Sequence, residues 1–104
     1  MALDVLNLMP GKKIVVTPGM IELGSIEDEE NCKFGEKIAE VADEVILIGE
    51  KQTRSILKGL QNKNYDVKHI FILDEVIEAF TLINKLKGKE TYILLENDLP
   101  DLFK

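Results

Sequence analysis

The sequence is poor in the residues that build metal centres, disulfide frameworks and nucleic-acid surfaces. Its 104 residues include one cysteine and one histidine, so we expect neither an intramolecular disulfide nor a standard zinc site. Tryptophan is absent, and 13 cationic side chains face 19 acidic ones, for a formal net charge of -6. An acidic chain is a poor nonspecific nucleic-acid binder, because the phosphate backbone attracts clustered Lys and Arg. We therefore expect no nucleic-acid partner.

Long apolar runs and a targeting signal are also missing. The first nine residues, MALDVLNLM, carry Asp4 and lack the basic start and the small-residue cleavage site of a secretory signal. No apolar run reaches the ~18–20 residues that cross a bilayer. The composition, 45% hydrophobic and 31% charged, is that of a globular protein, and the length fits one domain over residues 1–104. We expect a cytoplasmic protein with no membrane partner.

Four short runs rich in β-branched and aromatic residues predict strands, and helical spacing lies between them. The runs are Lys13–Thr17, Glu44–Ile48, His69–Leu73 and Thr91–Leu95, and their near-continuous apolarity indicates strands buried on both faces. Helical stripes are formed by Phe34, Ile38 and Val41, by Ile56, Leu57 and Leu60, and by Val76, Ile77, Phe80, Ile83 and Leu86. A further helix over Leu3–Met9 ends at Pro10-Gly11.

This alternation of helices and strands predicts an α/β fold. It implies right-handed βαβ crossovers and a three-layer, Rossmann-like domain with a mostly parallel sheet of about four to six strands. Ser25 with Asp28 predicts a capping-box start for the second helix, and Asp74 predicts the N-cap of the last one.

Ligands of such sheets bind at the carboxyl ends of the strands, near the point where the strand order reverses. The loops at those ends are residues 18–25, 49–53, 74–75 and 96–101. A strand order 3-2-1-4 makes the first and last of these loops neighbours, whereas 2-1-3-4 pairs the first with the third.

The first of these loops has the glycine spacing of a phosphate-binding loop without its chemistry. Gly19 and Gly24 are correctly spaced, but no lysine follows, and Glu22 would repel phosphate. No G-x-G-x-x-G occurs either. We therefore expect no self-contained nucleotide site, and no cofactor or metal bound by this chain itself.

The remaining polar candidates each allow a structural and a functional interpretation. Glu96, Asn97, Asp98 and Asp101 suit a solvated turn, a magnesium ion or a substrate ammonium group. Arg54, the only arginine, follows Gly49 at a helix start and suits either an exposed surface or an anion clamp. Cys32 and His69 each stand alone and are expected to be core or surface residues rather than a catalytic pair.

Three segments resemble the C-terminal domain of the Mur ligases. They are ALDVLNLMPGKKIVVTPGMIELG, FGEKIAEVADEVILIGEKQT and LLENDLPD, and the resemblance covers residues 2 to about 102. It is strongest to the branch that adds D-alanyl-D-alanine to a UDP-N-acetylmuramoyl-tripeptide. The first segment, with its G-M-x-E-L-G loop, is the most specific of the three.

The resemblance implies one domain of a larger cytoplasmic enzyme of peptidoglycan synthesis. In that family an N-terminal domain holds the UDP-muramoyl-peptide and a central domain holds ATP and Mg²⁺. The C-terminal domain closes over the central one and presents the incoming amine. Such a domain is inactive alone, because this sequence has no Gly-Lys-Thr/Ser loop.

Residue by residue, the resemblance implies a substrate and interdomain surface. Gly19, Glu22 and Gly24 match the family's loop motif, with Thr17 just before it, and Gly49 matches the glycine that ends the second strand.

The sequence also departs from the family at two places. Asn31 stands where many members have His, and Glu96-Asn97-Asp98 replaces a Lys-Gly-Ser-type turn. The residues also allow an alternative, a free-standing binding module whose acidic face over residues 20–50 docks a cationic partner.

Overall fold

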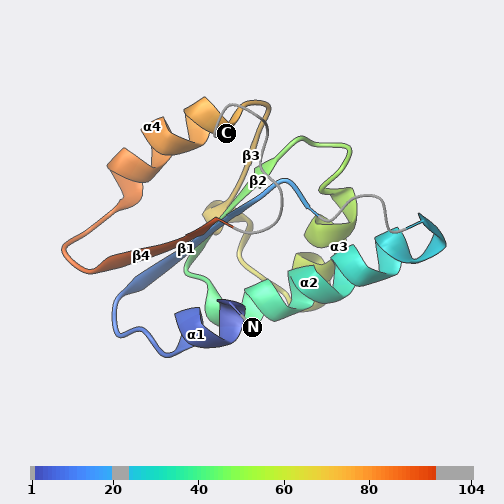
Figure 1. The fold of residues 1–104 in the computed structure, drawn as a ribbon, viewed down its shortest axis with the longest axis horizontal. Coiled ribbons are helices and arrows are strands. Elements are labelled where there is room, and N and C mark those ends of the chain that lie inside the picture. The colour runs from blue at the N-terminus through green and yellow to red at the C-terminus, as the bar shows by residue number, and fades with distance from the viewer. Residues whose placement is uncertain (1, 20–23, 96–104) are drawn as a thin grey trace.

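Strands and helices alternate along the chain in the order that the sequence predicts. The structure, a computed structural model, describes residues 2–19 and 24–95. Its strands are β1 (Lys12–Thr17), β2 (Glu44–Ile48), β3 (Ile70–Leu73) and β4 (Thr91–Leu95). Its helices are α1 (Ala2–Asn7), α2 (Glu27–Val41), α3 (Arg54–Asn62) and α4 (Val76–Leu86), with 3₁₀ turns η1 (Gly24–Ile26) and η2 (Val67–His69) (Figure 1).

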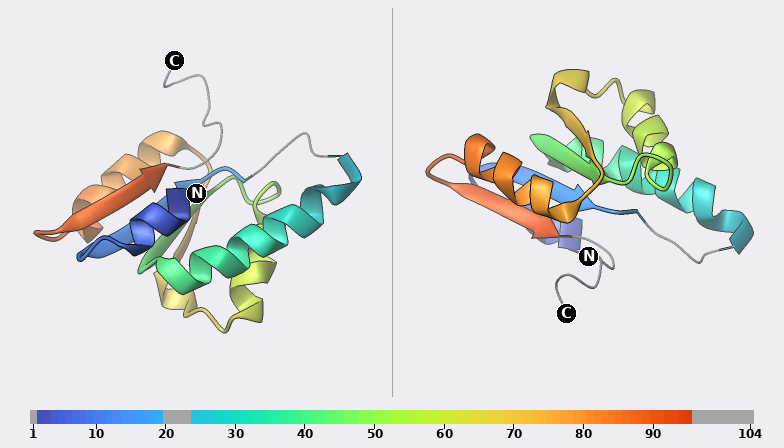
Figure 2. Two further views of the ribbon diagram at one scale, coloured as in Figure 1. Left: turned by 60° about the horizontal axis from the view of Figure 1, so that its bottom comes forward. Right: turned by 90° about the horizontal axis from the view of Figure 1, so that it is seen from above.

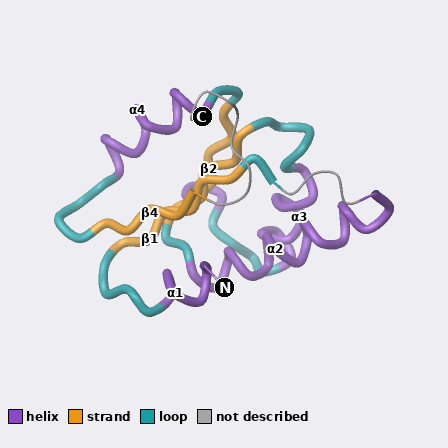
Figure 3. The backbone as a smooth tube through the Cα atoms, in the orientation of Figure 1, coloured by secondary structure: helices purple, strands orange, loops and turns teal. Residues whose placement is uncertain are grey.

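The four strands form one parallel sheet in the order β3-β2-β1-β4 (Figure 3). Of the two orders that the sequence leaves open, this is 3-2-1-4. The chain builds outward from β1 through β2 to β3, and then crosses by way of α4 to place β4 on the other side of β1. The boundary between β1 and β4 is therefore the switch point of the sheet.

Helices cover both faces of the sheet, which confirms a three-layer, Rossmann-like α/β fold. One face, with Val15 and Leu47, packs against α1, α2 and α3, and the other, with Ile14 and Ile46, packs against α4 (Figure 2). Both faces of β1 and β2 are apolar because alternate residues of a strand point to opposite sides. In the part of the chain that the structure describes, no helix is long and apolar enough to cross a membrane.

Two glycines let α2 and α3 touch backbone to backbone. A Cβ atom on Gly35 would overlap the carbonyl oxygen of Ile56, and one on Gly59 would overlap that of Cys32. The close approach of the two helices buries Ile38, Ile56 and Leu60, which have no exposed surface. These two positions admit no larger residue without moving one helix away from the other.

The two predicted helix caps are wrong. Helix α2 begins after Ile26, which has no capping side chain, and the carboxylate of Asp28 instead accepts a hydrogen bond from the Ser55 hydroxyl at 2.9 Å. The N-cap of α4 is Glu75 rather than Asp74, and the Glu75 N–H donates to Glu78 Oε1 at 3.0 Å. In α4 the N-cap lies one residue later than the sequence predicts. In α2 the Asp28 carboxylate bonds to a residue of another helix instead of taking part in a capping box.

The outer strands and α4 are less buried than their apolarity predicts. Ile72 of β3 is 42% exposed and Ile93 of β4 is 41% exposed. Within the predicted α4 stripe, Ile77 is 63% and Phe80 37% exposed, whereas Ile83 is buried. One helix covers this face, and it packs on β1, β2 and β3, so β4 remains uncovered on that side among the described residues.

Replacing Gly59 by alanine tests the contact between α2 and α3. The added methyl group meets backbone atoms of α2, so we expect G59A to lower the free energy of unfolding by about 1–3 kcal/mol despite alanine's better helix propensity. Gly88 is the matched control, because the nearest atom to its Cβ position is Thr91 Oγ1 at 4.0 Å. Urea denaturation should leave G88A within about 0.5 kcal/mol of the parent. Equal losses in both variants would contradict the contact.

Candidate functional site

The carboxyl ends of β1 and β4 lie side by side at the switch point. Val16 of β1 is level with Leu95, the last residue of β4. The loops that follow these strands therefore start from adjacent positions, as the 3-2-1-4 order predicts. In open parallel sheets this crevice is where ligands bind.

Three of the predicted site residues come together just beyond β1. Thr17 is fully buried, and its hydroxyl oxygen accepts a hydrogen bond from the Gly19 N–H at 3.0 Å. Gly19 has φ +86°, and a Cβ there would lie 2.9 Å from the Gln52 carbonyl oxygen and 3.4 Å from Asn31 Oδ1. The 1% exposed Asn31 donates from Nδ2 to the Glu27 carbonyl at 3.0 Å. Gly19 is thus the point where β1, α2 and the loop after β2 meet.

Gly49 shapes the neighbouring turn. It has φ +90°, and its N–H donates to the Leu73 carbonyl at 2.7 Å, which ties the ends of β2 and β3 together. Its own carbonyl accepts the Thr53 hydroxyl at 2.5 Å. Arg54 then opens α3 with an exposed side chain that forms no ion pair among the described residues. Gly49 is structural here, whereas Arg54 presents a cation to solvent.

The acidic first turn of α2 contacts the first turn of α3, which carries Arg54, at this edge. The first turn of α2 is formed by the acidic residues Glu27–Glu30. The hydrogen bond of 2.9 Å from Ser55 to Asp28 joins that turn to the first turn of α3, beside Arg54. An acidic helix start that contacts the helix turn carrying an arginine suits a ligand with both an ammonium group and a carboxylate.

Among the described residues, one further predicted site residue, Gly24, stands apart from this cluster. Gly24 has φ +65° and faces open space where η1 begins. Glu22, Glu96, Asn97 and Asp98 lie outside the described residues. Across residues 2–19 and 24–95, no three His, Cys, Asp or Glu side chains gather in a way that could hold a metal ion.

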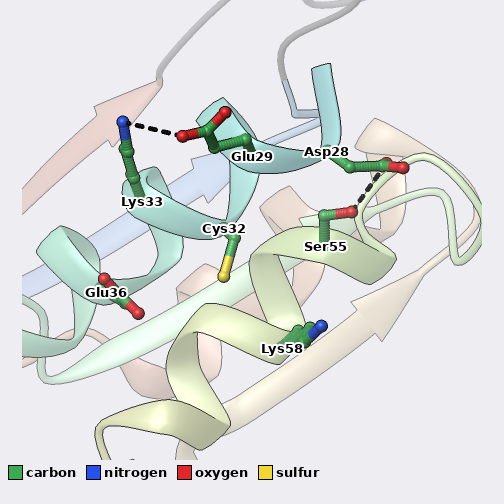
Figure 4. A pocket seen from close by; sticks show the side chains of 7 residues that line it. All are labelled: Asp28, Glu29, Cys32, Lys33, Glu36, Ser55 and Lys58. Carbon is green, nitrogen blue, oxygen red and sulfur yellow. Dashed lines mark hydrogen bonds and ion pairs between the residues drawn. The ribbon is translucent and has the colours of Figure 1, made fainter. Parts of the chain in front are cut away.

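A groove between α2 and α3 is one feature that the sequence does not reveal. Figure 4 shows the side chains that line it, which are Asp28, Glu29, Cys32, Lys33, Glu36, Ser55 and Lys58. The Cys32 thiol lies between the helices, and Lys33 pairs with Glu29 at 3.4 Å. Charges of both signs alternate along the walls, so the groove has no dominant electrostatic preference.

A second unforeseen cluster lies at the opposite, amino-terminal edge of the sheet. Glu44 is 5% exposed, and its two carboxylate oxygens meet His69 Nδ1 at 2.8 Å and Lys12 Nζ at 3.3 Å. The Lys12 ammonium also donates to the Leu86 carbonyl at 2.8 Å. The cluster ties β1, β2, η2 and the end of α4 together. His69, expected to be a core or surface residue, is half-exposed and paired.

Tyr65 closes the side of this cluster. Its hydroxyl donates to the Ala42 carbonyl at 2.9 Å. Burial, with smaller contributions from the negative charges of Glu44, Asp43 and Asp66, raises the pKa of Tyr65 well above its usual value. The phenol therefore stays a neutral hydrogen-bond donor at every physiological pH, which suits a structural role.

Comparison with protein-family models gives no match for this chain. A search of the curated proteins gives no match either.

Charge removal at Glu44 tests whether the amino-terminal cluster stabilises the fold. In E44Q the Lys12 ammonium loses its buried carboxylate partner and His69 loses a charged hydrogen-bond partner, so we expect a loss of about 1–3 kcal/mol in the free energy of unfolding. Glu40→Gln is the control, because Glu40 meets Lys63 at 3.9 Å with both side chains about half exposed. Exposed pairs contribute little, so E40Q should change stability by less than about 1 kcal/mol in the same urea titration. Equal changes in the two variants would contradict the structural role of Glu44.

Proposed function

We propose that this chain is the C-terminal, substrate-presenting domain of an ATP-dependent amide ligase of the Mur type, which acts in the cytoplasm. It binds the incoming D-alanyl-D-alanine dipeptide and closes over a central ATP-binding domain. The observation that carries the proposal is the position of Gly19, the first residue of the G-M-x-E-L-G segment, which follows β1 at the switch point.

The buried polar groups beyond β1 support a role in holding a loop rather than in proton transfer. Thr17 and Asn31 are enclosed, so they act as positioning residues for the backbone at Gly19. Backbone held in this way at Gly19 can help to place an amine at the distance and angle that attack requires, which supplies rate through proximity and orientation.

The neighbouring charges support a zwitterionic ligand. The ammonium group of a dipeptide complements the acidic start of α2, and its carboxylate complements Arg54 at the start of α3. A purely anionic ligand would pair with Arg54 and be repelled by the acidic start of α2. A neutral ligand would pair with neither charge.

The reaction itself requires groups that this proposal assigns to the central domain. The described residues gather no metal-binding set, and the loop after β1 carries no lysine, so they do not fit ATP or Mg²⁺. The proposed central domain would hold ATP and Mg²⁺, which would supply the chemical activation of the carboxylate of the UDP-muramoyl-peptide. This chain contributes the amine, already oriented, and hydrolyses no ATP alone.

Titration with D-alanyl-D-alanine tests the proposal by NMR. We expect amide shifts for residues 17–24 and 96–101 and for Arg54, and smaller shifts with L-alanyl-L-alanine. Thr17→Val removes the acceptor for the Gly19 N–H and should weaken the dipeptide about tenfold, the equivalent of about 1.4 kcal/mol.

Thr91→Val is the matched control for this titration. The Thr91 hydroxyl accepts the Gly88 N–H at 2.7 Å at the opposite edge of the sheet, so T91V loses a similar bond without touching the proposed site. Arg54→Gln should also weaken dipeptide binding. Lys58→Gln is its control, since both variants remove one cation from α3. Unmoved loops with both dipeptides, or equal weakening by T17V and T91V, would overturn the proposal.

A further inference from the structure

A pocket at the amino-terminal edge of the sheet contains a histidine held in one tautomer. His69 Nδ1 lies 2.8 Å from Glu44 Oε1, and an ionised carboxylate can only accept, so the hydrogen of this bond belongs to Nδ1. In the neutral ring, Nε2 therefore carries the lone pair. No described residue bonds to Nε2, and the His69 side chain is 47% exposed. The ring is thus held in the form that can accept a proton from a bound molecule.

The burial of Glu44 distinguishes this pair from an ordinary surface contact. Glu44 is 5% exposed, and its second oxygen, Oε2, lies 3.3 Å from Lys12 Nζ. A carboxylate held in this way fixes the orientation of the imidazole and stabilises the imidazolium that forms when Nε2 takes a proton. Glu44 and His69 therefore have the arrangement that general-base catalysis requires.

Lys12 provides a hydrogen-bond donor beside the same pair. Its ammonium group has three N–H donors and uses two of them, on the Leu86 carbonyl at 2.8 Å and on Glu44. The third has no partner among the described residues, and the Lys12 side chain lines the pocket and is 33% exposed. A cationic N–H next to a base can stabilise the negative charge that develops on a carbonyl oxygen under attack.

The pocket has the size and the charge of a site for a small uncharged or cationic molecule. Its volume is about 520 Å³, which is within the range of small-molecule sites. Asp43, Glu44 and Asp66 contribute negative charges to its lining, and Lys12 contributes one positive charge. Because the negative charges outnumber the positive one, the pocket repels anionic ligands. Tyr65 also lines the pocket and gives it an aromatic wall.

We propose that Glu44, His69 and Lys12 form a hydrolytic site for small uncharged or cationic carboxylic esters. His69 Nε2 accepts a proton from water while the water oxygen forms a bond to the ester carbonyl carbon, and a Lys12 N–H stabilises the oxyanion. The tetrahedral intermediate then collapses, the bond from carbon to the leaving oxygen breaks, and Nε2 returns the proton to that oxygen. His69 and Lys12 are the catalytic residues, and Glu44 is a positioning residue.

The tautomer of His69 tests the role of Glu44. Because the chain has one histidine, the ring nitrogen signals in a ¹H–¹⁵N correlation spectrum belong to it. At a pH of about 8, where an ordinary imidazole is neutral, we expect a protonated Nδ1 and an unprotonated Nε2. Glu44→Gln places an amide there that can donate or accept, so the variant should show a mixture of tautomers. A protonated Nε2 in the parent chain at this pH would overturn the proposal.

Hydrolysis of p-nitrophenyl acetate tests the activity itself. Free imidazole also cleaves this ester, so the benchmark is the second-order rate constant of imidazole at the same pH. We expect the full chain to exceed it by at least about tenfold, because a positioned base and an oxyanion donor act together. His69→Gln should remove the excess, and Lys12→Gln should reduce it about tenfold or more. Circular dichroism checks that each variant is folded.

Cys32→Ser and Lys63→Gln are the matched controls. Cys32, the one thiol of the chain, is a second nucleophile that could attack an ester, and it lies in the groove between α2 and α3. Lys63 pairs with Glu40 at 3.9 Å and does not line the pocket, so its variant removes one cation elsewhere. Both variants should keep the rate of the parent chain.

A rate no higher than that of free imidazole would overturn the proposal. Loss of the activity in Cys32→Ser, or its survival in His69→Gln, would overturn it as well. The outcome is independent of dipeptide binding, which the NMR titration measures at the opposite end of the strands.

Discussion

The rest of the structure depends on the enclosure of β1. β2 and β4 pair with its two edges, and helices cover its two faces, so Ile14, Val15 and Val16 have no exposed surface. A strand enclosed in this way can present chemistry only at its ends. Lys12 stands at one end and Thr17 at the other, and a polar cluster forms around each of them.

The two ends have different chemistry and therefore different roles. At the amino-terminal end, Lys12 neutralises the buried carboxylate of Glu44, and His69 Nδ1 lies 2.8 Å from the same carboxylate. At the carboxyl end, the Thr17 hydroxyl and the positive φ of Gly19 direct the chain away from β1. The ion pair of Lys12 with Glu44 stabilises the fold at the amino-terminal end of β1. The hydrogen bond of Thr17 positions the backbone at Gly19 at the carboxyl end.

The sequence predicts what burial alone dictates and misses what depends on the assembled fold. Runs of β-branched and aromatic residues predict all four strands to within a residue, although only β1 and β2 are buried on both faces. Helix starts are not predicted, because the Asp28 carboxylate finds Ser55 on another helix. The predicted α4 stripe also includes Ile77 and Phe80, which are 63% and 37% exposed. Periodicity shows which side of a helix is apolar but not whether that side is buried. No local pattern reveals the contact of Glu44 with a histidine 25 residues away. The substrate class stands on the family resemblance, because no spacing of residues encodes it.

Intermolecular NOEs between the methyl groups of D-alanyl-D-alanine and the isotope-labelled chain test the central claim most directly. If the carboxyl end of β1 is the binding site, cross-peaks will connect the dipeptide methyls to protons of the loop from Thr17 to Gly24 and to the Arg54 side chain. Cross-peaks to Lys58 in the groove between α2 and α3, or to Tyr65 at the amino-terminal edge, would place the ligand elsewhere and contradict the account. An absence of cross-peaks at saturating dipeptide would contradict it as well.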